Sequence, residues 1–178
     1  LDRPAALEPA AVHSLMLGVA RAGDRLVAVG ERGHVLLSDD AGNSWRQAKS
    51  VPSQTLLTAV AFADPQRGWA VGHDELILHT ADGGETWATQ HYAPAAEQAL
   101  LDLWLTDASN GLAVGAYELC YRTADGGKTW KRVPFEPAPL PGSQSASPDD
   151  EFAPDYHLNA IAGVGQRLYI AAEAGHLY

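Results

Sequence analysis

The sequence predicts an all-β fold, a β-propeller built from four-stranded antiparallel blades. Three observations predict it: an octapeptide occurs three times, its copies begin at residues 38, 80 and 123, and short apolar runs fill each interval. A repeat period of 20–50 residues is typical of solenoids and propellers. Because each interval has room for four short strands, one interval corresponds to one propeller blade.

The repeated octapeptide has the chemistry of a tight turn. Residues 38–45, 80–87 and 123–130 all read [Ser/Thr]-x-Asp-x-Gly-x-[Ser/Thr]-Trp. Asp, Ser and Thr side chains accept hydrogen bonds from nearby backbone N–H groups, and Gly supplies a positive φ. Each copy therefore predicts a hairpin tip whose second strand opens with Trp. We expect this Trp to plug the core, so that truncating a buried one to Ala costs about 3–5 kcal/mol.

The octapeptides resemble Asp-boxes, also called BNR repeats, of sialidases, sortilin-type receptors and several bacterial propellers. In those families the box is a peripheral structural hairpin and not the active site. The resemblance implies a structural role, and neither catalysis nor metal binding, for the residues that define the boxes: Ser38, Asp40, Gly42 and Trp45; Thr80, Asp82, Gly84 and Trp87; Thr123, Asp125, Gly127 and Trp130.

The boxes set the order of the predicted elements. Residues 1–11 are rich in Ala and Pro and are expected to be irregular. First strands are predicted at 12–19, 56–62, 100–105 and 157–164, second strands at 26–30, 69–72, 112–115 and 168–172, and third strands at 33–37, 75–79 and 118–122. Fourth strands open at the box tryptophans. Helical periodicity is absent over three turns.

The last repeat is incomplete in this sequence. Residues 175–178 align with 33–36, so residues 12–178 are predicted to form three blades and part of a fourth. A propeller ring needs about 4–8 blades, and a cut blade exposes strand edges and apolar faces. We therefore expect an incomplete ring in this chain, which the rest of a larger propeller or a second chain completes.

Residues 134–156 depart from the repeat. This insertion holds six of the eleven prolines and neither Lys nor Arg. Such a composition predicts an extended loop. Two interpretations stay open: a tolerated insertion without a role, and a loop that contacts a partner or covers a site.

Composition excludes several function classes. The 178 residues carry a formal charge of −10, and the twelve Lys and Arg form no run. This balance argues against nucleic acid and anionic membrane surfaces as partners. No apolar stretch reaches the length of a membrane span. The single Cys120 stands in an apolar run and reads as a small buried hydrophobe. The chain contains no signal peptide and begins at Leu1, as expected of a processed terminus or of a sequence boundary.

Strand alternation assigns the loops to two faces. In a four-stranded antiparallel blade the first and third turns share one face, here called the box face. The second turns and the inter-blade linkers share the opposite, non-box face. Binding candidates on the non-box face are Arg32, His73, Asp74, Glu75, Tyr117 and Glu118. A plain solvated loop is the alternative interpretation of each.

Searching for reactive groups yields no catalytic residue, metal site or cofactor. Nucleophile-elbow, phosphate-loop and zinc-protease motifs are absent. His73 beside Asp74 could form an acid/base or metal pair, and loop polarity also explains it. Glu75 and Glu118 occupy equal places in successive blades and could serve glycoside hydrolysis as paired carboxylates, although repeat symmetry alone accounts for them.

One run of residues resembles a known family more closely. The sequence reads Phe62-x-Asp64-x-x-x-Gly68-Trp69-Ala-Val-Gly72, and a variant with Leu for Trp69 recurs at 105–115. Both runs are similar to the photosystem II stability/assembly factor family. The resemblance implies a seven-bladed, non-enzymatic propeller, exported to a lumen or periplasm, that binds a protein partner such as a subunit of a membrane complex during assembly.

Basic residues refine this expectation. Photosynthetic members are associated with a basic patch for their partner, whereas Arg32, Arg67, Arg122 and Arg132 are scattered along this acidic chain. The pattern favours a bacterial relative outside photosynthesis. The predicted function is a protein-binding assembly or stability factor. The alternatives are a carbohydrate-active, sialidase-like or glycoside hydrolase propeller and a receptor-like ligand-binding propeller.

Overall fold

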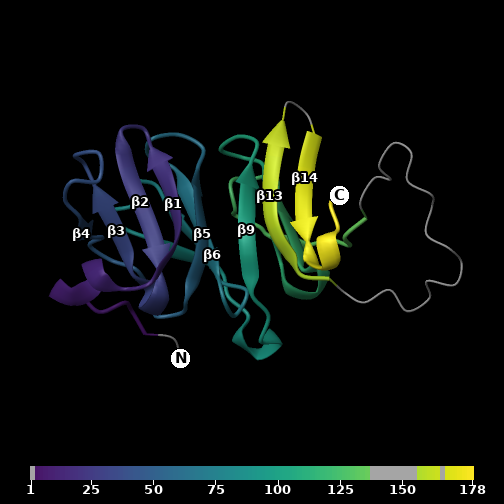
Figure 1. Cartoon of the computed structure of the whole chain (residues 1–178), viewed down its shortest axis with the longest axis horizontal. Helices are drawn as coiled ribbons and strands as arrows, with labels where there is room; N and C mark the ends of the chain where they lie inside the picture. Colours follow the sequence, from purple (N-terminus) through teal and green to yellow (C-terminus); the bar gives the residue numbers. More distant parts are fainter. Residues whose placement is uncertain (1–2, 137–155, 165–166) are drawn as a thin grey trace, which may run out of the picture.

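A computed structural model describes residues 3–136, 156–164 and 167–178, which fold into four antiparallel β-sheets that follow one another in chain order (Figure 1). Three sheets have four strands, ordered β1-β2-β3-β4, β5-β6-β7-β8 and β9-β10-β11-β12. The fourth sheet pairs β13 with β14. The all-β propeller architecture predicted from the sequence is confirmed.

Each sheet is one blade, and its strands run outward from the innermost strand. Blade 1 contains β1 (Met16–Ala22), β2 (Arg25–Gly30), β3 (Val35–Ser38) and β4 (Arg46–Gln47). Blade 2 contains β5 (Leu57–Phe62), β6 (Gly68–Gly72), β7 (Ile77–Thr80) and β8 (Ala88–His91). Blade 3 contains β9 (Leu100–Leu105), β10 (Gly111–Gly115), β11 (Cys120–Thr123) and β12 (Lys131–Arg132).

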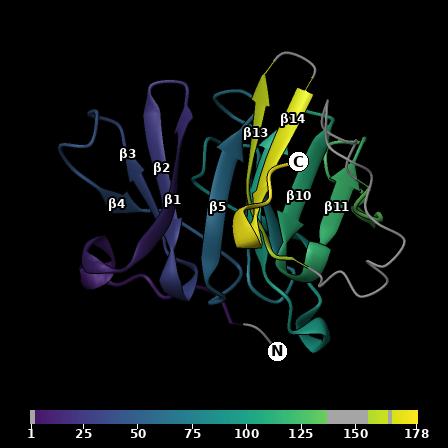
Figure 2. The ribbon, with the colours of Figure 1, turned by 45° about the vertical axis from the view of Figure 1, so that its right-hand side comes forward.

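Blade 4 contains β13 (Leu158–Val164) and β14 (Arg167–Ala172), which lie beside the third sheet (Figure 2). An antiparallel bridge between Ala171 and Leu177 begins a third ladder at the edge of β14. Among the described residues the sheets thus form an open arc. Most of the predicted 134–156 insertion, residues 137–155, lies outside the described residues.

Short 3-10 turns separate the strands. They are η1 (Pro9–His13), η2 (Glu31–Gly33), η3 (Pro94–Ala96), η4 (Ala116–Glu118) and η5 (Glu173–Gly175). The first of them explains why β1 begins at Met16, four residues later than the predicted strand. Pro9 has a fixed φ that suits the first turn of such a helix, and η1 packs its Ala11 on blade 1 beside Leu36. No helix among the described residues is long and apolar enough to cross a bilayer.

The core lies between the blades. One cluster joins blades 1 and 2, a second joins blades 2 and 3, and a third joins blades 3 and 4. A middle strand is therefore covered on both faces, as in β6, where every residue is buried. This double coverage explains the continuous apolar runs in the sequence, since an alternating pattern requires one solvated face.

The innermost strands also touch side by side. Strands β1, β5, β9 and β13 contact one another in that order. The Thr58 hydroxyl donates to the Leu100 carbonyl of the next blade at 2.7 Å. In the same way, the backbone N–H of Ile161 donates to Asp102 at 2.9 Å. These bonds hold the inner edge, where no further strand supplies backbone partners.

The three box tryptophans differ in burial because their neighbours differ. Trp87 is 5% exposed within the cluster between blades 1 and 2, and its indole N–H donates to the Gly84 carbonyl at 2.9 Å. Trp45 is partly buried, since η1 and the outer face of blade 1 are its main neighbours. Trp130 is also partly buried, against the second cluster. The expected buried plug therefore describes Trp87 only.

We predict that Trp87→Ala lowers the free energy of unfolding by about 3–5 kcal/mol, because it empties a full indole volume from the core. Trp45→Ala, at the equivalent but less buried place, serves as the matched control and should cost clearly less. Urea unfolding followed by circular dichroism measures both. Equal losses for the two variants would show that the box tryptophans do not act through inter-blade burial.

Candidate functional site

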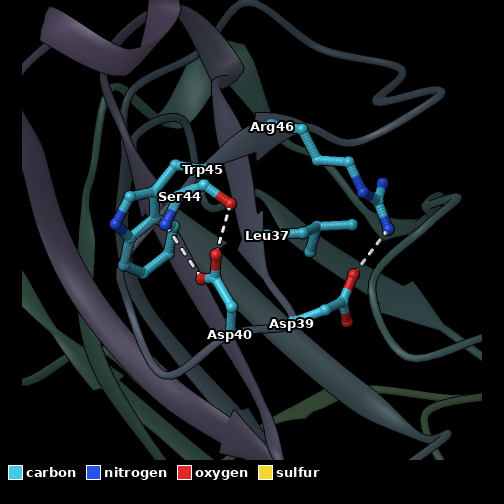
Figure 3. Close-up of a pocket in the computed structure, with 6 residues that line it drawn as sticks. All are labelled: Leu37, Asp39, Asp40, Ser44, Trp45 and Arg46. Carbon is cyan, nitrogen blue, oxygen red and sulfur yellow. Dashed lines mark hydrogen bonds and ion pairs between the residues drawn. The ribbon is translucent and has the colours of Figure 1, made fainter.

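The three Asp-boxes share one hydrogen-bond pattern, and Figure 3 draws the two bonds between Asp40 and Ser44 of the first box. In the second box, the Thr80 hydroxyl donates to Asp82 at 2.8 Å and accepts from the N–H of Gly84 at 3.0 Å. The Asp82 carboxylate also accepts from the N–H and the hydroxyl of Thr86, at 2.9 and 2.6 Å. The first and third boxes repeat these bonds around Asp40 and Asp125.

These bonds favour the ionised carboxylate. The Ser44 hydroxyl, then its N–H, lowers the pKa of Asp40 to about 2. The N–H and hydroxyl of Thr129 lower the pKa of Asp125. At Asp82 burial is the largest single contribution and acts in the opposite direction, yet the combined hydrogen bonds leave its pKa lowered. Three carboxylates held in this way are turn-forming groups.

A shallow pocket of about 170 Å³ lies beside the first box and is lined by Leu37, Asp39, Asp40, Ser44, Trp45 and Arg46 (Figure 3). Its charges are already paired. Asp39 accepts from Arg25 at 2.6 Å and from Arg46 at 3.2 Å, and both arginines also pair with Glu85 of the next blade. The network joins two blades at the box face. The pKa of Asp39 is lowered, mainly by its hydrogen bond from Arg25 and to a smaller extent by Arg46.

The non-box face carries four equivalent turns. Residues 31–34, 73–76, 116–119 and 173–176 each close with a backbone bond from the fourth N–H to the first carbonyl. Both central residues have positive φ, as in the turns that suit β-hairpins. Gly fills the second central place in blades 1 and 4, as Gly33 and Gly175. Glu75 and Glu118 fill it in blades 2 and 3, where a side chain with φ near +53° and +54° is strained.

The structure places the six binding candidates in the turns of the first three blades. Arg32, His73 and Tyr117 are exposed, Asp74 and Glu118 are partly exposed, and Glu75 is 2% exposed. Arg32 lies 4.0 Å from the Glu8 carboxylate, and the Tyr117 ring meets His157 edge to face. The His73–Asp74 pair has no third ligand, since the described residues contain no group of three or more His, Cys, Asp or Glu fit for a metal ion.

Glu75 is the unusual member of this set. Its Oε2 accepts from the Tyr121 hydroxyl of blade 3 at 2.6 Å and lies 3.3 Å from Nε2 of His91. Its Oε1 is buried without a hydrogen-bond partner among the described residues. Burial, and then the bond to Glu75, raises the pKa of Tyr121 to about 12. The carboxylate thus lies inside the interface of two blades and not at its surface.

A simple rule relates this interface to its neighbours. Tyr121 of blade 3 bonds Glu75 of blade 2, and the residues at the equivalent places in blades 2 and 1 are Leu78 and Gly33. Blade 4 again has a tyrosine, Tyr178, whose pKa is raised by burial and then by Glu118. In the sequence, Glu in one turn is thus followed by Tyr in the next blade, and Gly by Leu.

Sequence reasoning missed Gln90. Its side-chain oxygen accepts from the indole N–H groups of Trp69 at 2.8 Å and of Trp130 at 3.1 Å. A Cβ added at Gly127 would lie 1.9 Å from that oxygen, so the third box requires Gly there for close approach as well as for its φ of +78°. The residue of blade 3 that aligns with Gln90 is Val133, which is apolar. This difference between two repeats is the sequence signal that could have identified Gln90.

Taken together, the antiparallel blades and their box hairpins define an Asp-box β-propeller. Comparison with known proteins then gives the family. The model described as "Photosynthesis system II assembly factor YCF48" matches residues 47–149, more than half of the 178 residues, and the chain belongs to this family. The resemblance seen in the sequence is thereby confirmed.

Two curated relatives match shorter stretches. The chain is 34% identical over 89 residues to "Photosystem II stability/assembly factor HCF136, chloroplastic" of Cyanidioschyzon merolae, which covers 49% of this chain and 19% of that protein. It is 37% identical over 65 residues to "Photosystem II assembly lipoprotein Ycf48" of Synechocystis, covering 36% and 16%. The matches thus span less than a fifth of either relative.

A solved structure agrees with the propeller fold. The structure titled "YCF48 bound to D1 peptide" superposes with a TM-score of 0.59 at 20% identity, covering 91% of this chain and 63% of that chain. The chain therefore accounts for less than two thirds of that propeller.

We predict that Tyr121→Phe destabilises the protein by about 1–3 kcal/mol, because it removes a donor from a buried carboxylate. The control is the double variant Glu75→Gly with Tyr121→Leu, which reproduces the Gly33–Leu78 pair and should recover much of the loss. Thermal unfolding measures both. An unchanged stability in Tyr121→Phe would mean that the Glu75 carboxylate finds equal partners elsewhere.

Acid should weaken the first box. The folded pKa of Asp40, about 2, lies below its ordinary value of 3.8, so its contribution to stability is present above pH 4 and is lost as the pH falls towards 2. Carboxyl NMR titration should place its midpoint near 2. In Ser44→Ala, which lacks the hydroxyl donor, the midpoint should rise. A midpoint near 3.8 in the unchanged protein would contradict the box geometry.

Proposed function

We propose that the chain is a non-enzymatic, protein-binding propeller that assists assembly or stability of a membrane or envelope complex, and that its partner docks on the non-box face. Membership of an assembly-factor family supports the role. The observation that carries the docking face is the separation of charges between the two faces.

Many of the charges on the box face are paired with one another. Arg25, Arg46 and Lys49 all meet Glu85, and Arg67 bonds Asp64 within its own turn. The box carboxylates are likewise occupied by their own turns. A partner would have to break these bonds before it could use the groups, and exposed pairs of this kind contribute little free energy to any interface.

The four non-box turns carry an excess of acid. Their acidic residues outside the blade interface are Glu31, Asp74, Glu118 and Glu173, whereas Glu75 is buried; Arg32 is their one Lys or Arg. A surface of one sign steers an oppositely charged partner and suppresses wrong ones. The turns are also held by backbone bonds to the entry of each inner strand, such as His73 N–H to Leu56 O. Rigid loops lose little entropy when a partner binds.

Exposed rings add contact area to this acidic face. Tyr117 is 54% exposed at the tip of the blade 3 turn, with His157 against its ring. Tyrosine at the centre of a patch supplies much of the binding energy in protein interfaces. The combination suits a protein segment with basic and apolar side chains.

The burial of Glu75 favours binding over glycoside hydrolysis. That reaction needs two carboxyl groups at the sugar, and Glu75 is directed into the blade interface, where it bonds Tyr121. Glu118 alone would remain partly exposed.

The Synechocystis relative is named a lipoprotein, and we propose an exported, extracytoplasmic location for this chain too. The origin in a non-photosynthetic bacterium stays a prediction.

We predict that a photo-crosslinking phenylalanine analogue at Tyr117 captures a discrete protein from an envelope extract. The same analogue at Lys128, an exposed residue of the third box, is the matched control and should capture none or far less. Mass spectrometry of the crosslinked band identifies the partner. Crosslinking from Lys128 but not from Tyr117 would place the interface on the box face, and turnover of a glycoside panel would favour the enzyme.

A further inference from the structure

A groove of about 280 Å³ runs along the inner edge of the arc. Its lining comes from the innermost strands of all four blades and includes Leu17, Val19, Thr58, Leu101, Asp102 and Asn159. These strands lie next to one another across the molecule (Figure 1). The groove is separate from the boxes and from the non-box turns.

Asp102 breaks the repeat within this groove. The strand register pairs Asp102 with Val114, as it pairs Gly18 with Val29, Ala59 with Val71 and Ala160 with Ala171. Three of the four equivalent places therefore hold Gly or Ala. A blade can thus be built with a small residue at this place, and in blade 3 the carboxylate also accepts the N–H of Ile161 from blade 4.

The Asp102 carboxylate has room for one more partner. Its Oδ1 accepts from the N–H of Leu103 at 2.8 Å, and its Oδ2 accepts from the N–H of Ile161 at 2.9 Å. Each carboxylate oxygen can accept a second bond. Among the described residues no Lys, Arg or His forms an ion pair with it. Burial raises the pKa of Asp102 despite the two N–H donors, as expected of an anion without a counter-ion.

The remaining lining suits the stem of a long cation. Leu17 and Val19 are 48% and 65% exposed along one wall, and Leu101 lies on another. Long cationic side chains place their methylene stem on apolar surface and keep the charged head at a polar group. Asn159 of blade 4 and the Thr58 hydroxyl, which is already a donor to Leu100, offer oxygens near that head.

We propose that this groove binds one alkylguanidinium or alkylammonium group, with Asp102 as its anionic partner and Leu17 and Val19 against its stem. The volume admits one extended side chain or a small amine. Where the group is an arginine or lysine side chain of a docked protein, the proposal rests on the protein-binding function given above. A free amine such as agmatine presents the same chemistry.

The test uses the full 178-residue chain, labelled with ¹⁵N, and three probes. These are agmatine, the blocked peptide Gly-Gly-Arg-Gly-Gly, and the same peptide with citrulline, which keeps the shape of arginine and lacks its charge. The amides of Leu103 and Ile161 report directly, because both donate to Asp102. We expect saturable shifts at these amides with a cationic probe and none with citrulline.

The variants make the result specific. Asp102→Ala places in blade 3 the residue that blades 2 and 4 already hold, so it should fold, and its affinity for the cation should fall about tenfold or more, as for a lost charge-assisted hydrogen bond. Asp24→Asn, which removes one charge from an exposed turn, should leave the affinity unchanged. Shifts that persist in Asp102→Ala, or that citrulline reproduces, would overturn the proposal, as would their absence with every probe.

The two cationic probes separate the sources of the ligand. Saturable binding of agmatine supports a free amine, and binding of the arginine peptide alone supports a side chain of a protein. Crosslinking from Tyr117 together with a silent groove would overturn this proposal and leave the docking face intact.

Discussion

Every blade of this protein depends on its neighbours to cover both faces of its middle strands. Strand β6 is buried along its whole length because blade 1 covers one face and blade 3 the other. At about 25 cal/mol per Å² of apolar surface, this burial is the main term that opposes the loss of chain entropy. A single four-stranded sheet has no such cover, so the blade is a structural unit only within the array.

The inter-blade cover also decides what each repeated residue can do. All three boxes make the same local bonds, yet Trp87 is buried between blades 1 and 2 whereas Trp45 and Trp130 are partly buried. Polar contacts between blades differ in the same way. Gln90 accepts hydrogen bonds from the indoles of Trp69 and Trp130, and Tyr121 of blade 3 donates to Glu75 of blade 2. The boxes thus fix the hairpins, and the interfaces between blades fix the differences among the repeats.

Strand order and blade size could be predicted because they depend on local signals that recur at a constant period. The apolar runs, the turn residues and the boxes mark each strand within a few residues of its observed bounds, except at β1, which begins four residues late because η1 extends to His13. The candidate site was less predictable. Glu75 reads as an exposed loop acid in a single blade, and only the tyrosine of the following blade, 46 residues along the chain, explains its burial.

Departures from the repeat carry the information that the repeat itself lacks. Glycines at the closing turns, apolar middle strands and box aspartates are required of any blade, so these residues place the chain in its family without specifying a partner. Asp102 stands where three other blades hold Gly or Ala, and Glu75 stands at a backbone conformation that suits Gly. Each departure has a local energetic cost, from a partly desolvated charge in one case and a strained φ in the other. Neither cost occurs in every blade, and in this chain both of these departures are acidic. In this chain the closing turns and the inner groove therefore differ from blade to blade, whereas the covered middle strands stay apolar in each blade.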